Sequence, residues 1–150
     1  MDRLKIIVCD DEVVQQRIIR ALLEKYLKEN EIQAELKFYA SGQEGLLEKG
    51  ELMDTDIFLL DIFMPELNGI DIARELKNMG AEGKIIFITG GNDYITEAFE
   101  IHAFSYIQKS VEYEKFAKVM HSVLKCLEKA RYLDIIADRE KRRIYLADIV

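Results

Sequence analysis

Five short apolar runs alternate along the chain with segments that have helical spacing, and this alternation limits the possible folds more than any other feature. The most apolar run is residues 56–62, whereas residues 33–40 alternate between apolar and polar side chains, which is typical of a half-exposed edge strand. The expected strands are residues 4–9, 33–40, 56–62, 84–88 and 104–108, and the expected helices are residues 13–29, 41–50, 70–79, 93–102 and 112–132.

This order of elements predicts an α/β fold. Strands that alternate with helices of this length form a parallel sheet with helices on both faces. Right-handed crossovers leave few strand orders. We expect a flavodoxin-like (βα)5 doubly wound sheet of order 2-1-3-4-5, followed by a long C-terminal helix, because runs 1 and 3 are the most apolar and run 2 resembles an edge strand.

Composition narrows the class of protein. The 150 residues are 49% hydrophobic and 33% charged, which fits one globular domain with a sizeable core. The formal net charge of −7 argues against a protein that coats nucleic acid. No apolar run approaches the ~20 residues that a membrane-spanning helix needs. The two cysteines, Cys9 and Cys126, lie in apolar segments, so we expect reduced thiols and a cytoplasmic protein.

The pattern changes after residue 132. Residues 133–137 and 143–146 are mostly apolar and flank the polar stretch 138–142, which predicts a strand, a turn and a second strand. A lone hairpin is marginally stable. We therefore expect one domain over residues 3–130, with residues 131–150 forming a linker and the beginning of a further domain that this chain does not complete.

The ends of the predicted strands carry polar residues that can share one chemistry. Asp10 and Asp11 follow the first strand, Asp61 follows the third, Thr89 ends the fourth and Lys109 follows the fifth. In an open α/β sheet, ligands bind outside the carboxyl ends of the strands. Three carboxylates that meet there repel one another unless a cation lies among them, and hard oxygen ligands suit Mg²⁺.

A metal ion alone does not account for Thr89 and Lys109 at the same edge. A hydroxyl and an ammonium group suit an anionic phosphoryl group beside the metal, and a carboxylate can accept such a group covalently. A single Asp at a strand end is usually a turn or cap residue, and a Lys there is usually solvated. The combination on four strands of one pattern favours a functional site.

These residues belong to a recognisable set. Over residues 3–130 the sequence resembles the receiver domain of response regulators in bacterial two-component signalling. The matching residues are Asp10-Asp11, Asp61-x-x-Met64-Pro65-x-x-x-Gly69, Thr89 and Tyr106-x-x-Lys109.

The resemblance implies a metal site and a phosphoacceptor. Asp61 would accept the phosphoryl group. Asp11 and Asp61 would bind Mg²⁺ directly, Asp10 would act mainly through water, and the backbone carbonyl of Phe63 would be a further ligand.

The resemblance also implies a switch. Thr89 and Lys109 would hold the phosphoryl oxygens, and Tyr106 would be the aromatic residue that follows Thr89 toward the phosphate. The sequence alone favours a different role for Tyr106, that of an aromatic residue at the edge of the core. The sequence departs from the family at Ser110, where proline is usual, so we expect the Lys109 loop to differ in shape.

The region from Thr89 to Lys109 resembles receivers of LytTR-type regulators, and residues 141–149 resemble the first strands of a LytTR DNA-binding domain. This resemblance implies a two-component response regulator that a sensor histidine kinase phosphorylates, that forms a homodimer on phosphorylation, and that controls transcription by binding DNA through a C-terminal domain largely absent here.

Two other functions stay open. One is a stand-alone receiver that acts on a protein partner. The other is a Mg²⁺-dependent phosphatase with an aspartyl-phosphate intermediate, which is disfavoured because such enzymes usually place a second acid where this chain has Phe63. We expect no enzymatic activity beyond self-phosphorylation and slow self-dephosphorylation.

Overall fold

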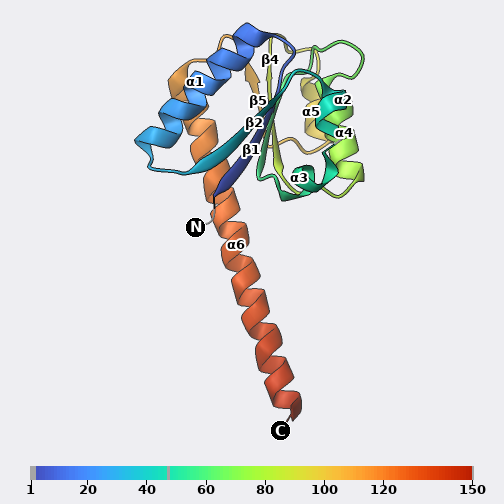
Figure 1. Cartoon of the computed structure of the whole chain (residues 1–150). Helices are drawn as coiled ribbons and strands as arrows, with labels where there is room; N and C mark the ends of the chain where they lie inside the picture. Colours follow the sequence, from blue (N-terminus) through green and yellow to red (C-terminus); the bar gives the residue numbers. More distant parts are fainter. Residues whose placement is uncertain (1–2, 47, 150) are drawn as a thin grey trace. The chain divides into compact units, whose positions relative to one another are not determined.

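A computed structural model describes residues 3–46 and 48–149. Its five parallel strands lie in the order β2-β1-β3-β4-β5, which confirms the predicted sheet. In Figure 1, α1 covers one face of this sheet and α2 to α5 cover the other. The strands are β1 (Leu4–Cys9), β2 (Ala34–Tyr39), β3 (Ile57–Leu60), β4 (Lys84–Thr89) and β5 (Ser105–Gln108).

The burial of each strand follows its sequence pattern. Every residue of β3 is buried, as are nearly all residues of β1 and β4, because these strands lie inside the sheet and have helices on both faces. All six residues of β2 are half-buried, which confirms the predicted edge strand. Phe58 and Phe87 are the largest side chains in the core layer between the sheet and α4.

The helices also agree with the predicted pattern, with one early exception. The described helices are α1 (Val13–Glu29), α2 (Gly42–Leu46), α3 (Lys49–Asp54), α4 (Gly69–Asn78), α5 (Ile95–Glu100) and α6 (Tyr113–Ile149). The single helix expected over residues 41–50 is two helices. Ser41 caps the first, since its Oγ accepts a hydrogen bond from the Glu44 backbone at 3.3 Å. Gly50 does not end the second helix, because an exposed glycine inside a helix costs only about 1 kcal/mol.

The hairpin predicted over residues 133–146 is wrong, because α6 is helical to Ile149. The apolar run 133–137 is compatible with either structure. The intervening polar stretch has no Gly, Pro or Asn to form a turn, and its side chains instead pair at helical spacing. Arg142 lies 3.4 Å from Asp138, and Arg143 lies 3.5 Å from Glu140.

The chain divides into two compact units, residues 1–117 and 118–150. The first contains the whole sheet and the second most of α6. The assignment of residues 131–150 to the beginning of a DNA-binding domain stays a prediction. Within the described part of the chain, no helix combines the length and the apolar character needed to cross a membrane.

Candidate functional site

The polar residues at the carboxyl ends of the strands meet at one edge of the sheet, as the sequence predicts. Asp10 follows β1 and Asp61 follows β3, and the Asp61 backbone donates a hydrogen bond to the Cys9 carbonyl at 2.9 Å. Lys109 follows β5, and its backbone donates to the Thr89 carbonyl at 2.8 Å. The order β1-β3-β4-β5 therefore places all four side chains along one rim.

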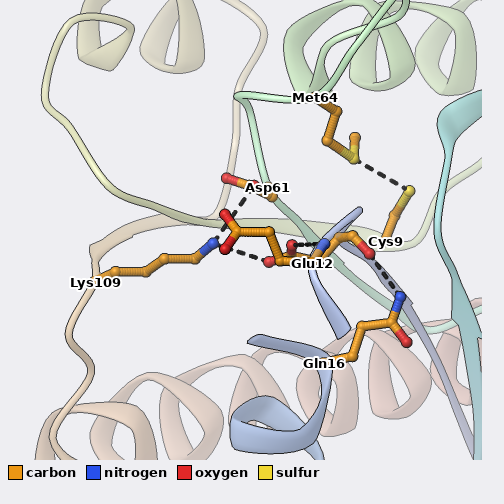
Figure 2. Close-up of polar contacts among 7 residues, drawn as sticks. Cys9, Glu12, Gln16, Asp61, Met64 and Lys109 are labelled. Carbon is orange, nitrogen blue, oxygen red and sulfur yellow. Dashed lines mark hydrogen bonds and ion pairs between the residues drawn. The ribbon is translucent and has the colours of Figure 1, made fainter. Parts of the chain in front are cut away.

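Lys109 connects the two buried aspartates (Figure 2). Its Nζ donates a hydrogen bond to Asp10 Oδ2 at 2.9 Å and lies 3.4 Å from Asp61 Oδ2. Burial alone would lower the pKa of Lys109, but its hydrogen bond to Asp10 and the charge of Asp61 outweigh burial, so its pKa is raised. Lys109 therefore stays protonated, as an ammonium ion. The peptide bond that follows it, to Ser110, is cis.

Asp61 lies in an environment that disfavours its charge. Its side chain is 4% exposed, and burial raises the pKa of its carboxyl, while Lys109 lowers it and Asp10 raises it further. The same surroundings act on Cys9, where burial, followed by the charges of Asp10 and Asp61, raises the pKa of the thiol to about 12. A bound cation would relieve this unfavourable field.

The three aspartates fit a divalent cation. Carboxylate oxygens of Asp10, Asp11 and Asp61 all lie within 4.8 Å of one another. Asp11 Oδ1 and Asp61 Oδ1 are buried, and among the described residues neither has a hydrogen-bond partner. Three hard oxygen donors with free lone pairs suit Mg²⁺.

Asp10 differs from the other two aspartates because both of its carboxylate oxygens have partners. Oδ2 accepts from Lys109, and Oδ1 accepts from the Glu12 backbone at 3.0 Å. This is compatible with the predicted role of Asp10 through water rather than by direct ligation. The predicted contribution of the Phe63 carbonyl stays a prediction.

Gly69 allows the loop after β3 to fold back on Asp61. A Cβ atom at Gly69 would lie 2.2 Å from the Asp61 carbonyl oxygen, so only glycine fits. Its backbone donates to the Ile62 carbonyl at 3.0 Å. Directly before it, Asn68 forms a capping box with Asp71 at the beginning of α4. The Gly69 of the sequence motif thus fixes the backbone that carries the predicted phosphoacceptor.

Thr89 and Tyr106 lie on the β4 side of the site. Thr89 is fully buried, and its Oγ1 has no hydrogen-bond partner among the described residues. Tyr106 is half-buried, and its hydroxyl donates to the Gly91 carbonyl at 2.5 Å, in the loop after β4. This contact ties the predicted switch residue to the loop that follows Thr89.

One residue that supports the site, Gln16, has no sequence signal that predicts its role. Gln16, on α1, donates from Nε2 to the backbone carbonyl of Asp10 at 2.6 Å (Figure 2). This bond anchors the end of β1 to the first turns of α1. A glutamine on the polar side of a helix carries no signal of such a contact.

A model of the response regulator receiver domain family matches residues 6–121. The chain belongs to this family. Sensory transduction protein LytT of Bacillus anthracis is 32% identical over 145 residues, which are 92% of this chain and 57% of LytT. This receiver spans about half the length of the curated relatives it matches.

Solved receiver structures have the same fold. The response regulatory domain of protein mrkE from Klebsiella pneumoniae is 25% identical, with a TM-score of 0.74 over 84% of this chain and 99% of that one. A response regulator receiver domain protein from Clostridium thermocellum is 28% identical, with a TM-score of 0.72 over 85% of this chain and 98% of that one. These likenesses confirm the predicted receiver fold.

Proposed function

We propose that a sensor histidine kinase phosphorylates this receiver on Asp61 and that the phosphoryl group switches its interaction with a partner. The observation that carries the proposal is a trio of aspartates beside the ammonium of Lys109: Asp10 and Asp61 are buried, Asp11 is half-buried, and oxygens of Asp11 and Asp61 have no hydrogen-bond partner among the described residues. Two anionic carboxylates and an ammonium in one buried cluster cost stability, which indicates a functional reason to retain them.

In the transfer, a carboxylate oxygen of Asp61 forms a bond to phosphorus while the bond from phosphorus to the donor histidine nitrogen breaks. The nitrogen leaves with the electron pair. Lys109 Nζ, 3.4 Å from Asp61 Oδ2, lies where it can neutralise a phosphoryl oxygen, and the unpartnered Thr89 hydroxyl can donate to another. Mg²⁺ held by Asp11 and Asp61 would supply further charge neutralisation.

Tyr106 would change its position when Asp61 is phosphorylated. In this structure its hydroxyl is held by the Gly91 carbonyl. When Thr89 engages the phosphoryl group, the loop after β4 shifts, and Tyr106 gains an alternative position. The phosphoryl group makes contacts in one of two states only, which is the requirement for a population shift.

The output of the switch is proposed from chemistry and from the relatives. α5 presents Phe99, which is 83% exposed, and Ile95, which is 47% exposed, next to β5. This apolar face suits a second copy of the chain, so phosphorylation would favour a homodimer. Similarity to LytT favours a cytoplasmic transcription regulator that binds DNA through a LytTR-type domain beyond these residues.

A switch rather than an enzyme is favoured by the residue two places after Asp61. The Phe63 side chain can neither donate nor accept a proton, so turnover of a small phosphate ester would be slow. Phe63 and Gly91 also provide no polar side chain to orient a hydrolytic water, so we propose a long-lived phosphorylated form. Phe63→Asn should speed the loss of phosphate; an unchanged rate would contradict this point.

The test of the proposed function combines phosphorylation with assembly. The protein is treated with phosphoramidate and Mg²⁺, and its intact mass and its elution from a sizing column are measured. We expect a gain of one phosphate and a dimer. A phosphorylated protein that remains monomeric would favour the stand-alone receiver, and steady turnover of p-nitrophenyl phosphate would favour the phosphatase.

A further inference from the structure

An aromatic pair bridges the two loops that border the site. The ring of Phe63, in the loop after β3, lies edge-on to the ring of Tyr94, with centroids 5.5 Å apart and an interplanar angle of 68°. Phe63 is 47% exposed, which is unusual for a residue so close to a buried charged cluster. Edge-on aromatic pairs of this geometry are attractive beyond the apolar area that they bury.

Gly91 provides the place where the Phe63 ring lies. A Cβ atom at Gly91 would be 3.5 Å from Phe63 Cε2 and 3.7 Å from Cζ, so the ring lies beside Gly91 and a methyl group there would just touch it. Phe63 is two residues after Asp61, and Gly91 is two residues after Thr89. Since β3 and β4 are neighbours, the ring spans the gap between the loops that follow Asp61 and Thr89.

Tyr94 is itself held in place by the helix that it precedes. It is the N-cap residue of α5, and its carbonyl accepts a hydrogen bond from the Ala98 backbone at 2.9 Å. A half-exposed phenylalanine without such a neighbour would exchange rotamers on a short timescale. The backbone of Tyr94 is thus fixed at the beginning of α5, and its partly buried ring, which packs against the core, limits the positions that the Phe63 ring can occupy.

We propose that Tyr94 is a positioning residue that sets the lifetime of the phosphorylated form by holding Phe63 across the mouth of the site. This inference rests on the proposed phosphorylation of Asp61. Hydrolysis requires a water oxygen to form a bond to phosphorus while the bond from phosphorus to the Asp61 oxygen breaks. The carboxylate leaves with the electron pair, and the water gives one proton to solvent. The Phe63 ring restricts the approach of that water, and Tyr94 keeps the ring there.

The experiment measures the rate at which phosphate is lost. The full chain is phosphorylated with phosphoramidate and Mg²⁺, the donor is removed, and the phosphorylated fraction is followed by intact mass. Tyr94→Ala should lose phosphate roughly two- to tenfold faster than the wild type, the ratio expected when one aromatic pair is removed. Tyr94→Phe keeps the ring and should restore the wild-type rate. Tyr132→Ala removes an exposed tyrosine on α6 and serves as the matched control.

A double variant separates positioning through Phe63 from a general loosening of the site. Phe63→Ala should also lose phosphate faster, and adding Tyr94→Ala to it should give no further increase, because the ring that Tyr94 holds is gone. Equal rates for Tyr94→Ala and wild type would overturn the inference, as would additive effects of the two substitutions. Should Tyr94→Ala fail to fold, Tyr94→Leu replaces it, with the same expected direction.

The outcomes distinguish this inference from the proposed function. If the wild-type chain gains no phosphate, the proposed function itself fails. If wild type and Tyr94→Ala are loaded to the same extent and lose phosphate at the same rate, phosphorylation of Asp61 stands and the role of Tyr94 is wrong. If Tyr94→Ala is loaded to the same extent as the wild type and loses phosphate faster, both the proposed function and the role of Tyr94 are supported.

Discussion

Two clusters of lysines and acids lie on the same sheet, one at the carboxyl ends of the strands and one beside the edge strand β2, and they differ in burial. At the carboxyl end, Asp10 is fully buried and the Lys109 side chain is 14% exposed. Beside β2, the side chains of Lys37 and Glu51 are 36% and 39% exposed, next to a cavity of about 290 Å³. Glu51 is also satisfied, because Lys37 and the Tyr39 hydroxyl bond its two oxygens.

The difference shows that ion pairing alone does not mark a site. The ion pair beside β2 is open to solvent, and such pairs contribute little to stability. The carboxyl-end cluster is buried and leaves oxygens of Asp11 and Asp61 without partners among the described residues. A buried, incompletely paired cluster is costly in the free protein, and a cation and a phosphoryl group would complete it.

The largest contrast is expected from two glycines, one at each cluster. Gly69→Ala should destabilise the protein by about 2–3 kcal/mol, because the new Cβ would lie 2.2 Å from the Asp61 carbonyl oxygen. Gly50→Ala, in α3 beside the cavity next to β2, meets no atom within 4 Å and should stabilise the protein by about 0.5–1 kcal/mol. Urea unfolding followed by circular dichroism measures both. A Gly69→Ala protein as stable as the Gly50→Ala protein would show that the backbone at Gly69 does not pack closely against the Asp61 carbonyl.

The next largest difference between the two clusters is expected in the stability that Mg²⁺ binding provides. With Mg²⁺ at about a hundred times its dissociation constant, unfolding should require about 2.7 kcal/mol more than in a chelating buffer. Asp11→Ala should abolish this gain, since it removes an unpartnered donor oxygen. Glu51→Gln, in the exposed cluster, should keep it in full. Thermal unfolding by calorimetry tests the pair, and equal loss of the gain in both variants would show nonspecific screening.

The pH dependence of stability should reveal the cost of the Asp61 charge in metal-free buffer. Because the pKa of Asp61 is raised by burial, the folded protein holds this proton more tightly than the unfolded chain does. The resulting stability is present below the ordinary carboxyl pKa of 3.8 and is lost as the pH rises through the folded pKa.

Asp61→Asn lacks this loss. The variant should become more stable than the wild type as the pH rises, reaching an advantage of about 1 kcal/mol near neutrality. The comparison of unfolding free energies at several pH values measures the difference. A wild type that is more stable than Asp61→Asn in chelating buffer would contradict the direction of the pKa shift.

The smallest effect is expected in the exposed cluster. Glu51→Gln should change the free energy of unfolding by about 0.5 kcal/mol or less, because Lys37 and Glu51 are both well solvated. The extent of phosphorylation should be unchanged. A loss of several kcal/mol would show that the two clusters are energetically alike, against the comparison drawn above.

The same contrast explains how much of the molecule its sequence predicts. Asp10, Asp61, Thr89 and Lys109 each end or follow a strand, and parallel pairing brings all such positions to one edge, so the site follows from the fold. The distance between Lys109 Nζ and Asp10 does not follow in this way, since it depends on side-chain rotamers.

Contacts that depend on loop geometry cannot be predicted from the sequence. The edge-on contact between Phe63 and Tyr94 joins residues 31 positions apart in two loops without regular periodicity. The failed hairpin after residue 132 has a different cause. A short, mostly apolar run fits a strand or a helix, and the polar stretch after it has no Gly, Pro or Asn to form a turn, so α6 continues through it with Arg142 and Arg143 paired at helical spacing.

The central claim is that the buried carboxylate of Asp61 accepts a phosphoryl group. The most direct test treats wild type and Asp61→Asn with phosphoramidate and Mg²⁺, followed by intact mass and peptide mapping. The account predicts one phosphate on the wild type, located on Asp61, and none on the variant, while Glu51→Gln is phosphorylated like the wild type. An equal gain of phosphate by Asp61→Asn, or a wild type that gains none, would contradict it.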